Sequence, residues 1–331
     1  SFIYQNIMYM LAGEVIHKIS GKPWDEFIAE RLFKPLGMTN TYATYRQSLG
    51  YDNRITPHFM YEDSVIKPIP TIISKTVDAA GGVWSCADDI TKWMRFMLDG
   101  AKLNGERLLQ PQTYEALFTP QTLVPPSEFY PTQKFTKPHW MSYGLGWFQH
   151  DYKGRMVQFH TGSLDGAVAI IGLIPDANFG VYVFGNMDHT ELRHALMYKA
   201  MDMWVFNSDT TDWSRDLYGL YTGIAAQGDS AQRSFEAQRI PGTKPSAALN
   251  AYTGIYSNQT YGAASVIQLN DSLLLQFPNH FNLFLSHWHY DTFLAKYERE
   301  WYGKDYVRFN LNASGKVSGF SFAGIEYEKK E

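Results

Sequence analysis

The fold class follows from residues 143–186, YGLGWFQHDYKGRMVQFHTGSLDGAVAIIGLIPDANFGVYVFGN. Gly, Asp and Pro residues divide this stretch into short apolar runs, which are typical of antiparallel strands. We expect the strands at 143–149, 155–159, 167–174 and 180–184. Residues 187–206 return to helical spacing, with one apolar face formed by Leu192, Ala195, Leu196, Ala200, Met203 and Trp204. The prediction is an antiparallel sheet closed by a helix.

The chain before this sheet is predicted to be mainly helical. Apolar residues recur at three- and four-residue spacing in residues 6–20, and Gly21 can end the helix. A second helix is expected at 23–33, because its leading proline suits the first turn of a helix. Residues 41–80 show no sustained period, so we expect long loops of the kind that shape a binding cleft.

A third helix is expected to begin after Ser85 and to end near Gly100. Ser85 and Asp88 have the spacing of a capping box, in which a hydroxyl and an acid satisfy the first N–H groups of a helix. Asp88 and Asp89 form a carboxylate pair, which could suggest acid/base chemistry. We assign both a structural role, because negative charge is favoured at a helix N-terminus.

Length and composition predict two folded domains. The chain has 331 residues, and roughly 150 residues per domain is typical. With 45% hydrophobic and 19% charged residues, it can build a core and does not have the composition of a disordered chain. Residues 1–206 form the first predicted domain, 207–246 a partly helical linker, and 247–331 a small all-β barrel. The predicted fold class is therefore α+β.

Charge, cysteine content and hydropathy exclude several classes of protein. The net charge is -4 and no basic stripe is present, so we expect no nucleic-acid partner. The one cysteine, Cys86, excludes an intramolecular disulfide and a cysteine-based zinc site. No apolar run approaches the roughly 20 residues that span a bilayer, so we expect no membrane span.

His287 and His289 are candidate metal ligands, because residues two apart on a strand point to the same face. No third ligand is evident, so we expect no metal and no cofactor, and we place His287-Trp288-His289-Tyr290 in the barrel interior. The barrel could hold a small apolar ligand. The continuous run 273–277 instead favours a packed strand and a lid or docking role for the barrel.

Residues 1–206 contain a series of short landmarks in a fixed order. They are Tyr4-x-Asn6, Pro35-Leu36-Gly37-Met38, Ala80-Gly81-Gly82 with Ser85 and Asp88, Tyr143-Gly-Leu-Gly146-Trp147, His160-Thr161-Gly162 and Gly185-Asn186. Taken in this order, they resemble the serine β-lactamase and penicillin-binding-protein superfamily. The resemblance is strongest to its class C-like branch, which includes esterases and D-amino-acid peptidases. Residues from about 246 to 331, with Tyr252-Thr-Gly254-Ile-Tyr256, are similar to the lipocalin-like domain often found behind such hydrolases.

The resemblance implies catalytic roles for Tyr4 and Asn6. Tyr4 would share a proton with the lysine and the attacking serine of the family, which requires a pKa lowered by nearby positive charge. Asn6 would hydrogen-bond that lysine and a substrate carbonyl. Judged by their local sequence alone, Tyr4 would be a core aromatic residue and Asn6 the N-cap of helix 6–20.

The resemblance also implies catalytic roles for His160 and Ser163, which lie with Thr161 and Gly162 at the substrate edge of the sheet. Ser163 would give its backbone N–H to the oxyanion hole, although locally it is an ordinary turn residue. Thr161 and Gly162 would bind the substrate. His160 stands where many β-lactamases have lysine, and a histidine attracts a substrate carboxylate less strongly. This substitution favours an esterase or D-peptidase over a true β-lactamase.

The nucleophile of the family belongs to a Ser-x-x-Lys motif upstream of Tyr-x-Asn. Only three residues precede Tyr4, so we expect the nucleophile and the first strands of the catalytic sheet to lie outside this chain. Ser64-Val65-Ile66-Lys67 has the right letters, but it follows Tyr4, and Pro68 and Pro70 oppose a helix. We interpret it as a chance match.

The predicted function is therefore that of a serine hydrolase fragment, inactive by itself, whose complete form acts through an acyl-enzyme on an ester, amide or D-amino-acid peptide. A non-catalytic peptide-binding or regulatory protein is the alternative. The expected partners are a small-molecule or short peptide substrate, and a missing segment or another chain that covers apolar surface on the sheet and on helix 6–20. The sequence does not fix the compartment, although related proteins are often periplasmic or secreted.

Overall fold

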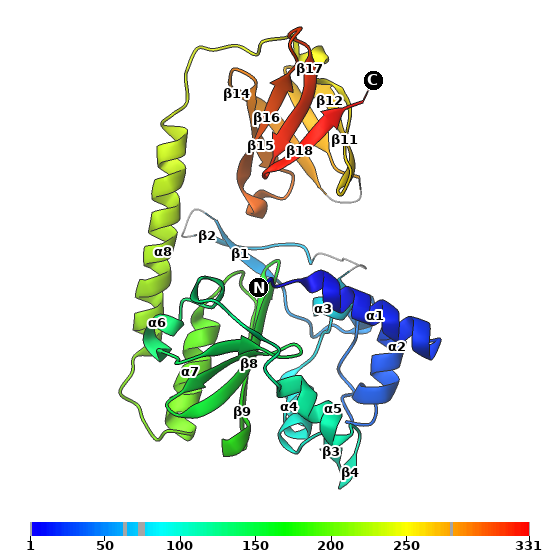
Figure 1. The fold of residues 1–331 in the computed structure, drawn as a ribbon, viewed down its shortest axis with the longest axis vertical. Coiled ribbons are helices and arrows are strands. Elements are labelled where there is room, and N and C mark those ends of the chain that lie inside the picture. The colour runs from blue at the N-terminus through cyan, green and yellow to red at the C-terminus, as the bar shows by residue number, and fades with distance from the viewer. Residues whose placement is uncertain (1, 62–64, 72–76, 279–280, 331) are drawn as a thin grey trace. The chain divides into compact units, whose positions relative to one another are not determined.

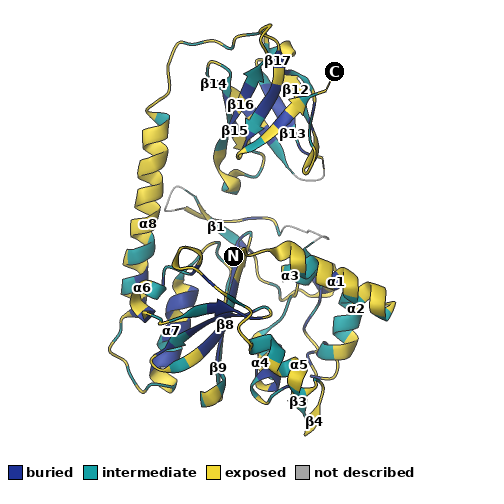
Figure 2. Cartoon of the chain, in the orientation of Figure 1, coloured by how far each residue is buried: buried dark blue, intermediate teal, exposed yellow. Residues whose placement is uncertain are grey.

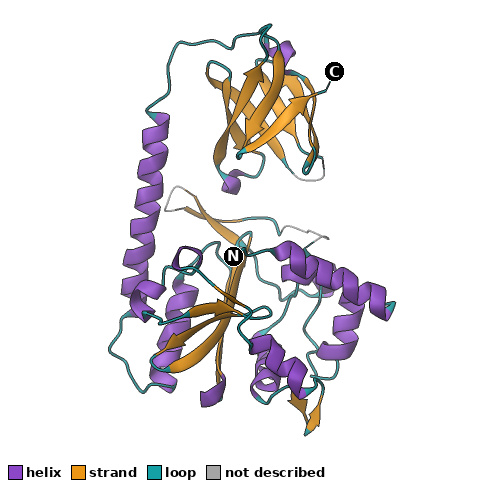
Figure 3. Cartoon of the chain, viewed as in Figure 1, coloured by secondary structure: helices purple, strands orange, loops and turns teal. Residues whose placement is uncertain are grey.

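The computed structural model describes residues 2–61, 65–71, 77–278 and 281–330 (Figure 1). The chain divides into two compact units, Ser1–Ile224 and Ala225–Glu331. The first combines helices with an antiparallel sheet, and the second is an antiparallel barrel (Figure 3). The predicted α+β class is confirmed. The long helix α8 (Trp213–Glu236) occupies much of the region for which we predicted a partly helical linker.

The central sheet has the strand order β10-β9-β8-β7-β6-β5, and all neighbours are antiparallel. The expected strands are present with one correction. The run 143–149 is two strands, because the backbone turns between Tyr143 and Phe148, where Gly146 has a φ of 84° that favours glycine. The strands are β5 (Thr122–Leu123), β6 (Met141–Tyr143), β7 (Phe148–Tyr152), β8 (Arg155–Leu164), β9 (Ala167–Ile174) and β10 (Phe179–Gly185).

Helix α7 (Leu192–Trp204) packs against β9 and β10, as the sequence predicted, but with a different face. Ala195, Met197, Tyr198 and Met201 are buried (Figure 2). Four members of the predicted face are exposed instead, namely Leu192 (48%), Leu196 (44%), Met203 (44%) and Trp204 (71%). The prediction failed because α7 also buries polar side chains that have hydrogen-bond partners, which apolar periodicity does not detect.

Two glycines test this packing in opposite directions. A Cβ at Gly172 of β9 would lie 2.5 Å from Met201 Cε and 2.7 Å from Met197 Sδ, whereas a Cβ at Gly219 of α8 would meet nothing within 4 Å. We expect Gly172→Ala to lower the free energy of unfolding by about 1–3 kcal/mol through overpacking. Gly219→Ala should raise it by about 0.5–1 kcal/mol, because glycine is a poor helix former. Urea unfolding of both variants checks the pair, and a stable Gly172→Ala would contradict the close approach of α7.

Most of the remaining helices of the first unit lie on the other side of the sheet from α7, whereas α6 lies beside the start of α8 (Figure 1). α1 ends at Gly21, whose φ is 72°, and this confirms the predicted helix 6–20. The predicted helix 23–33 is an α-helix that continues as a π-helix over Ala29–Phe33. The helices are α1 (Asn6–Ser20), α2 (Trp24–Ile28), α3 (Asp78–Gly81), α4 (Ala87–Leu98), α5 (Pro111–Phe118) and α6 (Gln133–Thr136).

The predicted capping box of α4 is not formed. Cys86 is the N-cap, and no side chain caps the helix. The Ser85 hydroxyl pairs with Thr41 Oγ1 at 2.8 Å. Asp89 is fully buried and forms an ion pair with Lys92. It also accepts hydrogen bonds from Asn40 N and Thr41 Oγ1. Its structural role is thus to fasten the loop after α2 to α4.

The outer face of α1 is an apolar stripe that is exposed in this chain. Its residues are between 52% and 82% exposed, and they are Ile7, Met8, Leu11, Val15 and Ile19. This confirms the expected apolar surface on helix 6–20. What covers the stripe stays a prediction.

The loops between 41 and 80 contain only short elements. Val65–Pro68 is a strand, so Lys67 is not on a helix, and Ser64 lies outside the described residues. The short elements described in the first unit are the 3-10 helices Arg46–Gly50, Pro126–Glu128 and Pro175–Ala177 and the strands β1 (His58–Tyr61), β2 (Val65–Pro68), β3 (Lys102–Leu103) and β4 (Glu106–Arg107).

The second unit is a closed barrel of antiparallel strands, β11 to β18 in sequence order. Its interior is filled by side chains, among them the aromatic rings of Tyr252, Tyr256, Phe293, Phe309 and Phe320. The strands are β11 (Gly254–Asn258), β12 (Gly262–Leu269), β13 (Ser272–Gln276), β14 (Asn282–His289), β15 (Thr292–Tyr297), β16 (Lys304–Leu311), β17 (Val317–Phe322) and β18 (Ile325–Lys329).

Within the described parts of the chain, no helix has the length and apolar character needed to cross a membrane.

The histidines of β14 do not lie together in the barrel interior as we expected. A register shift between His287 and His289 breaks the alternation of the strand. His287 contacts the backbone oxygen of Tyr290, while His289 Nδ1 accepts a hydrogen bond from Ile240 N. Tyr290 is 51% exposed, so this part of the prediction was wrong.

Candidate active site

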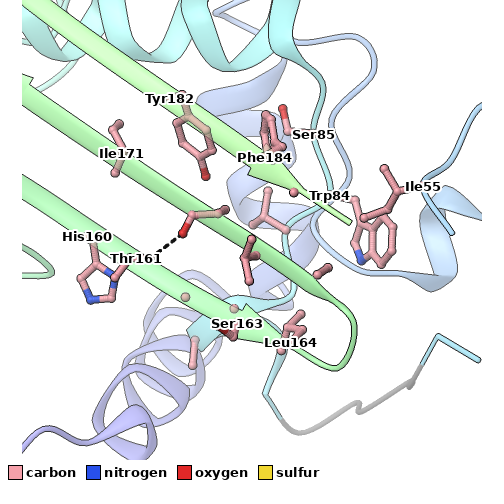
Figure 4. A pocket seen from close by; sticks show the side chains of 18 of the residues that line it. Ile55, Trp84, Ser85, His160, Thr161, Ser163, Leu164, Ile171, Tyr182 and Phe184 are labelled. Carbon is pink, nitrogen blue, oxygen red and sulfur yellow. Dashed lines mark hydrogen bonds between the residues drawn. The ribbon is translucent and has the colours of Figure 1, made fainter. Parts of the chain in front are cut away.

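A cleft of about 1730 Å³ opens at the end of β8 (Figure 4). Its floor is one face of β8, β9 and β10, on which His160, Ile171 and Tyr182 lie in register. The start of α1 and the loops around 40–58 and 77–88 form its walls. All the predicted site residues line it, namely Tyr4, Asn6, His160, Thr161, Gly162 and Ser163. The head of the first helix and the edge at Thr161 thus line one cleft, and the catalytic roles of these residues stay a prediction.

The end of β8 extends beyond β7. The last pair with β7 is Phe148 with Phe159, whereas pairing with β9 continues to Leu164 with Ala167. Among the described strands, none therefore pairs with the β7-facing edge of residues 160–164. An unpaired strand edge offers backbone donors and acceptors to an extended ligand.

Tyr4 and Asn6 contact each other directly. The Tyr4 hydroxyl donates to Asn6 Oδ1 at 3.1 Å, and the Tyr4 ring centroid lies 6.0 Å from that of His160. Both local alternatives are excluded, because Tyr4 is 40% exposed and the N-cap of α1 is Gln5. Burial, and to a lesser degree the neighbouring Tyr9, raises the pKa of Tyr4. The phenol is therefore protonated in this chain, whereas the expected catalytic role requires a lowered pKa.

His160 is held neutral. Tyr9 donates its hydroxyl proton to Tyr143 Oη at 3.3 Å, and Tyr143 Oη shares a hydrogen bond of 3.1 Å with His160 Nε2. Burial lowers the pKa of His160 to about 4. A neutral imidazole has no charge with which to attract a carboxylate. Sequence reasoning noted Tyr143 as a landmark but did not assign it to the site.

Hydrogen bonds to β9 and from α7 hold the residues 161–163 at the end of β8. Thr161 Oγ1 donates to Ala169 O on β9 at 2.8 Å. Arg193, in the first turn of α7, donates from one nitrogen to Gly162 O at 2.8 Å and to Ser163 Oγ at 2.7 Å. Sequence reasoning missed Arg193, since a single arginine in an apolar helix gives no signal of its partner.

The buried histidines predict a loss of stability in mild acid. Burial lowers the pKa of His150 to about 4, as for His160, whereas both should titrate near 6.5 when unfolded. Between these values the unfolded chain binds protons that the folded chain does not, so stability falls as the pH drops from about 6.5 towards 4. We expect His150 alone to contribute about 2 kcal/mol of loss between pH 7 and 5. Urea unfolding at both pH values should show this loss reduced in His150→Gln and unchanged in His17→Gln, on the exposed surface of α1.

The comparisons with known proteins agree with this geometry. The Beta-lactamase family model matches residues 1–202. The chain belongs to the Beta-lactamase family. The barrel of this β-lactamase-family chain is matched over residues 238–331 by a domain of unknown function, DUF3471.

Similar curated proteins come from Aspergillus violaceofuscus and Staphylococcus aureus. The chain is 25% identical over 291 residues to Unguisins hydrolase ungD of Aspergillus violaceofuscus, and this match covers 81% of the chain and 50% of the relative. It is 24% identical over 194 residues to Protein flp of Staphylococcus aureus, and this match covers 56% of the chain and 34% of the relative. The chain thus spans half or less of the length of these curated relatives.

The fold is also that of a solved protein. The octameric penicillin-binding protein homologue from Pyrococcus abyssi superimposes with a TM-score of 0.56 at 20% identity, over 99% of this chain and 65% of that chain. At this identity, the likeness shows a shared fold and nothing further.

Proposed function

We propose that this β-lactamase-family chain forms the substrate-binding part of a serine hydrolase that acts through an acyl-enzyme on an ester, amide or D-amino-acid peptide. The observation that supports this is the shared cleft, in which Tyr4 and Asn6 face the unpaired end of β8. The acyl-accepting serine and its lysine would come from polypeptide outside these 331 residues. A cleft of about 1730 Å³ exceeds the roughly 300–1,000 Å³ of a typical small-molecule site, and so has room for such a segment beside a substrate.

In the proposed reaction, the serine oxygen bonds to the substrate carbonyl carbon, and the bond from that carbon to the leaving group breaks. The serine proton passes through Tyr4 or the lysine to the leaving group, which departs as an alcohol or amine. The backbone N–H of Ser163 stabilises the oxyanion, and Asn6 orients the lysine and the substrate carbonyl. Water then attacks the acyl-enzyme and releases the acid. The raised pKa of Tyr4 fits this scheme only if the lysine ammonium lies close to the phenol and lowers its pKa.

The neutral state of His160 favours substrates that need no cation at this position. A β-lactamase lysine offers a permanent charge, whereas the imidazole of His160 has a lowered pKa and shares a hydrogen bond with the Tyr143 hydroxyl. We therefore propose esters and D-amino-acid amides or peptides before penicillins. The name of the fungal relative, a hydrolase, agrees with the reaction class.

The test compares two proteins. One is the chain extended upstream of Ser1 as its gene encodes, and the other is the 331-residue chain. We expect the extended protein to hydrolyse a short-chain nitrophenyl ester or a D-amino-acid amide, and the shorter chain to hydrolyse neither. A folded extended protein without either activity would overturn the enzyme hypothesis.

The alternative, a non-catalytic peptide-binding or regulatory protein, draws support from the protonated Tyr4. It predicts that the upstream sequence lacks Ser-x-x-Lys at the family spacing. It also predicts that the folded extended protein binds a D-amino-acid peptide without cleaving it, which calorimetry and a product assay distinguish.

A further inference from the structure

We propose that Arg193 is a positioning residue, whose guanidinium holds the Gly162–Ser163 peptide bond so that the Ser163 N–H is directed as an oxyanion donor. This inference rests on the proposed function. Arg193 does not line the cleft itself, and it would act through the backbone of β8.

The guanidinium is placed by burial and by two contacts to adjacent residues. Arg193 is only 6% exposed, and one of its nitrogens donates both to Gly162 O and to Ser163 Oγ, at 2.8 and 2.7 Å. Hydrogen bonds from a charged donor are about twice as strong as neutral ones. These hydrogen bonds connect the end of β8 to α7, the helix that packs against β9 and β10.

The planarity of the peptide bond makes this contact relevant to the site. Gly162 O and the Ser163 N–H belong to one peptide unit, and in a trans peptide they point in opposite directions. Fixing the oxygen therefore fixes the direction of the N–H. A positive charge on the oxygen also polarises the unit, which makes the N–H a stronger donor.

Gly162 and Ser163 pair with Ala169 and Val168 of β9, but among the described strands only on that side. A Cβ at Gly162 would meet nothing within 4 Å, so side-chain packing does not restrain the plane of this peptide. The β7 side of the strand offers no partner among the described residues. Arg193 supplies a restraint that neither packing nor strand pairing on that side provides.

A half-buried acid, Glu191, in turn holds Arg193. Glu191 Oε1 lies 3.2 Å from Arg193 and Oε2 lies 2.7 Å from His194 Nδ1. Burial raises the pKa of Glu191, but the hydrogen bond from His194 and the charges of His194 and Arg193 outweigh it and lower the pKa. Glu191 is thus ionised and neutralises the guanidinium.

The network is poorly suited to stability alone. Arg193 Nε and His194 Nε2 are buried and have no hydrogen-bond partner within the described part of the chain. Unsatisfied buried polar groups cost free energy, and a buried ion pair often stabilises less than apolar residues of the same volume. A role in the site accounts for the arrangement better than a role in folding.

The experiment measures kcat and KM of the extended protein with a nitrophenyl ester. Arg193→Lys keeps the charge but loses the planar fork, and Arg193→Ala loses both. We expect kcat to fall about 10²-fold in Arg193→Ala, with KM nearly unchanged, because a small misplacement of a catalytic group has an effect of this size. Added guanidinium ion should restore part of kcat in Arg193→Ala. Arg155→Gln, on the exposed start of β8, is the matched control and should keep the full kcat.

Unchanged kcat in folded Arg193→Ala and Arg193→Lys would overturn the proposal. So would a loss of kcat that follows only the loss of thermal stability and is not rescued by guanidinium. If the extended wild-type protein is folded but inactive, the proposed function fails. The positioning role of Arg193 is then tested separately, by the amide proton resonance of Ser163 in the 331-residue chain. It should move upfield in Arg193→Lys and stay in place in Arg155→Gln, and an unmoved resonance in Arg193→Lys would refute the positioning role.

Discussion

Asp202→Ala is expected to lower the free energy of unfolding of the first unit by about 3–5 kcal/mol. Asp202 lies near the end of α7 and is only 1% exposed. Its Oδ1 accepts from the Tyr152 hydroxyl at 2.8 Å and from Lys153 Nζ at 2.5 Å, while Oδ2 accepts from Trp213 Nε1 at 2.8 Å. Removing the carboxylate leaves the buried Tyr152 and Trp213 donors without an acceptor, and each such group costs about 1–3 kcal/mol.

Urea unfolding followed by tryptophan fluorescence measures this loss, and Trp213 itself reports on the start of α8. Asp202→Asn keeps the shape but puts N–H groups against other donors, so its effect should be intermediate. The control is Asp209→Ala, because Asp209 is 76% exposed and its ion pair with Lys199 should contribute less than about 1 kcal/mol. Equal effects of Asp202→Ala and Asp209→Ala would mean that α7 and α8 are not joined through this carboxylate.

The sequence predicted the elements whose pattern is local. β9 has the same bounds as the predicted run 167–174, because both faces of this strand are apolar and turns limit it at each end. α1 was predicted equally well from its spacing and from Gly21. The second unit is a closed antiparallel barrel, as predicted for residues 247–331. In each case the physical cause of the element lies within its own residues.

The errors arose where a distant partner decides the structure. Ser85 forms a hydrogen bond to Thr41 instead of capping α4, and nothing in the sequence around Ser85 indicates that contact. The buried face of α7 depends on Gly172 and on partners for Arg193 and Asp202. The same limit applied to the site, where the ordered landmarks placed the residues in one cleft but could not show what holds them.

Tyr4→Phe in the extended protein is the second substitution with a large expected effect, on activity instead of stability. We expect kcat for ester hydrolysis to fall by about 10²–10⁴-fold, which is the contribution of a general acid or base. The phenylalanine ring keeps the packing of Tyr4 on Phe148, whose ring centroid is 6.1 Å away. Only the hydroxyl that donates to Asn6 is lost, and since this group is exposed, stability should change by less than about 0.5 kcal/mol.

The matched control is Tyr51→Phe, which also removes a phenol from a partly exposed ring that lines the cleft. It should leave kcat within about threefold, because Tyr51 lies on the loop wall and has no part in the proposed proton transfer. Asn6→Ala should lower kcat as well, since it removes the amide oxygen that accepts the hydrogen bond of the Tyr4 hydroxyl. If Tyr4→Phe and Tyr51→Phe have equal kcat in a folded and active extended protein, the proton is carried by another group. Tyr4 would then be a wall of the cleft, and the lysine of the missing motif would have to act alone.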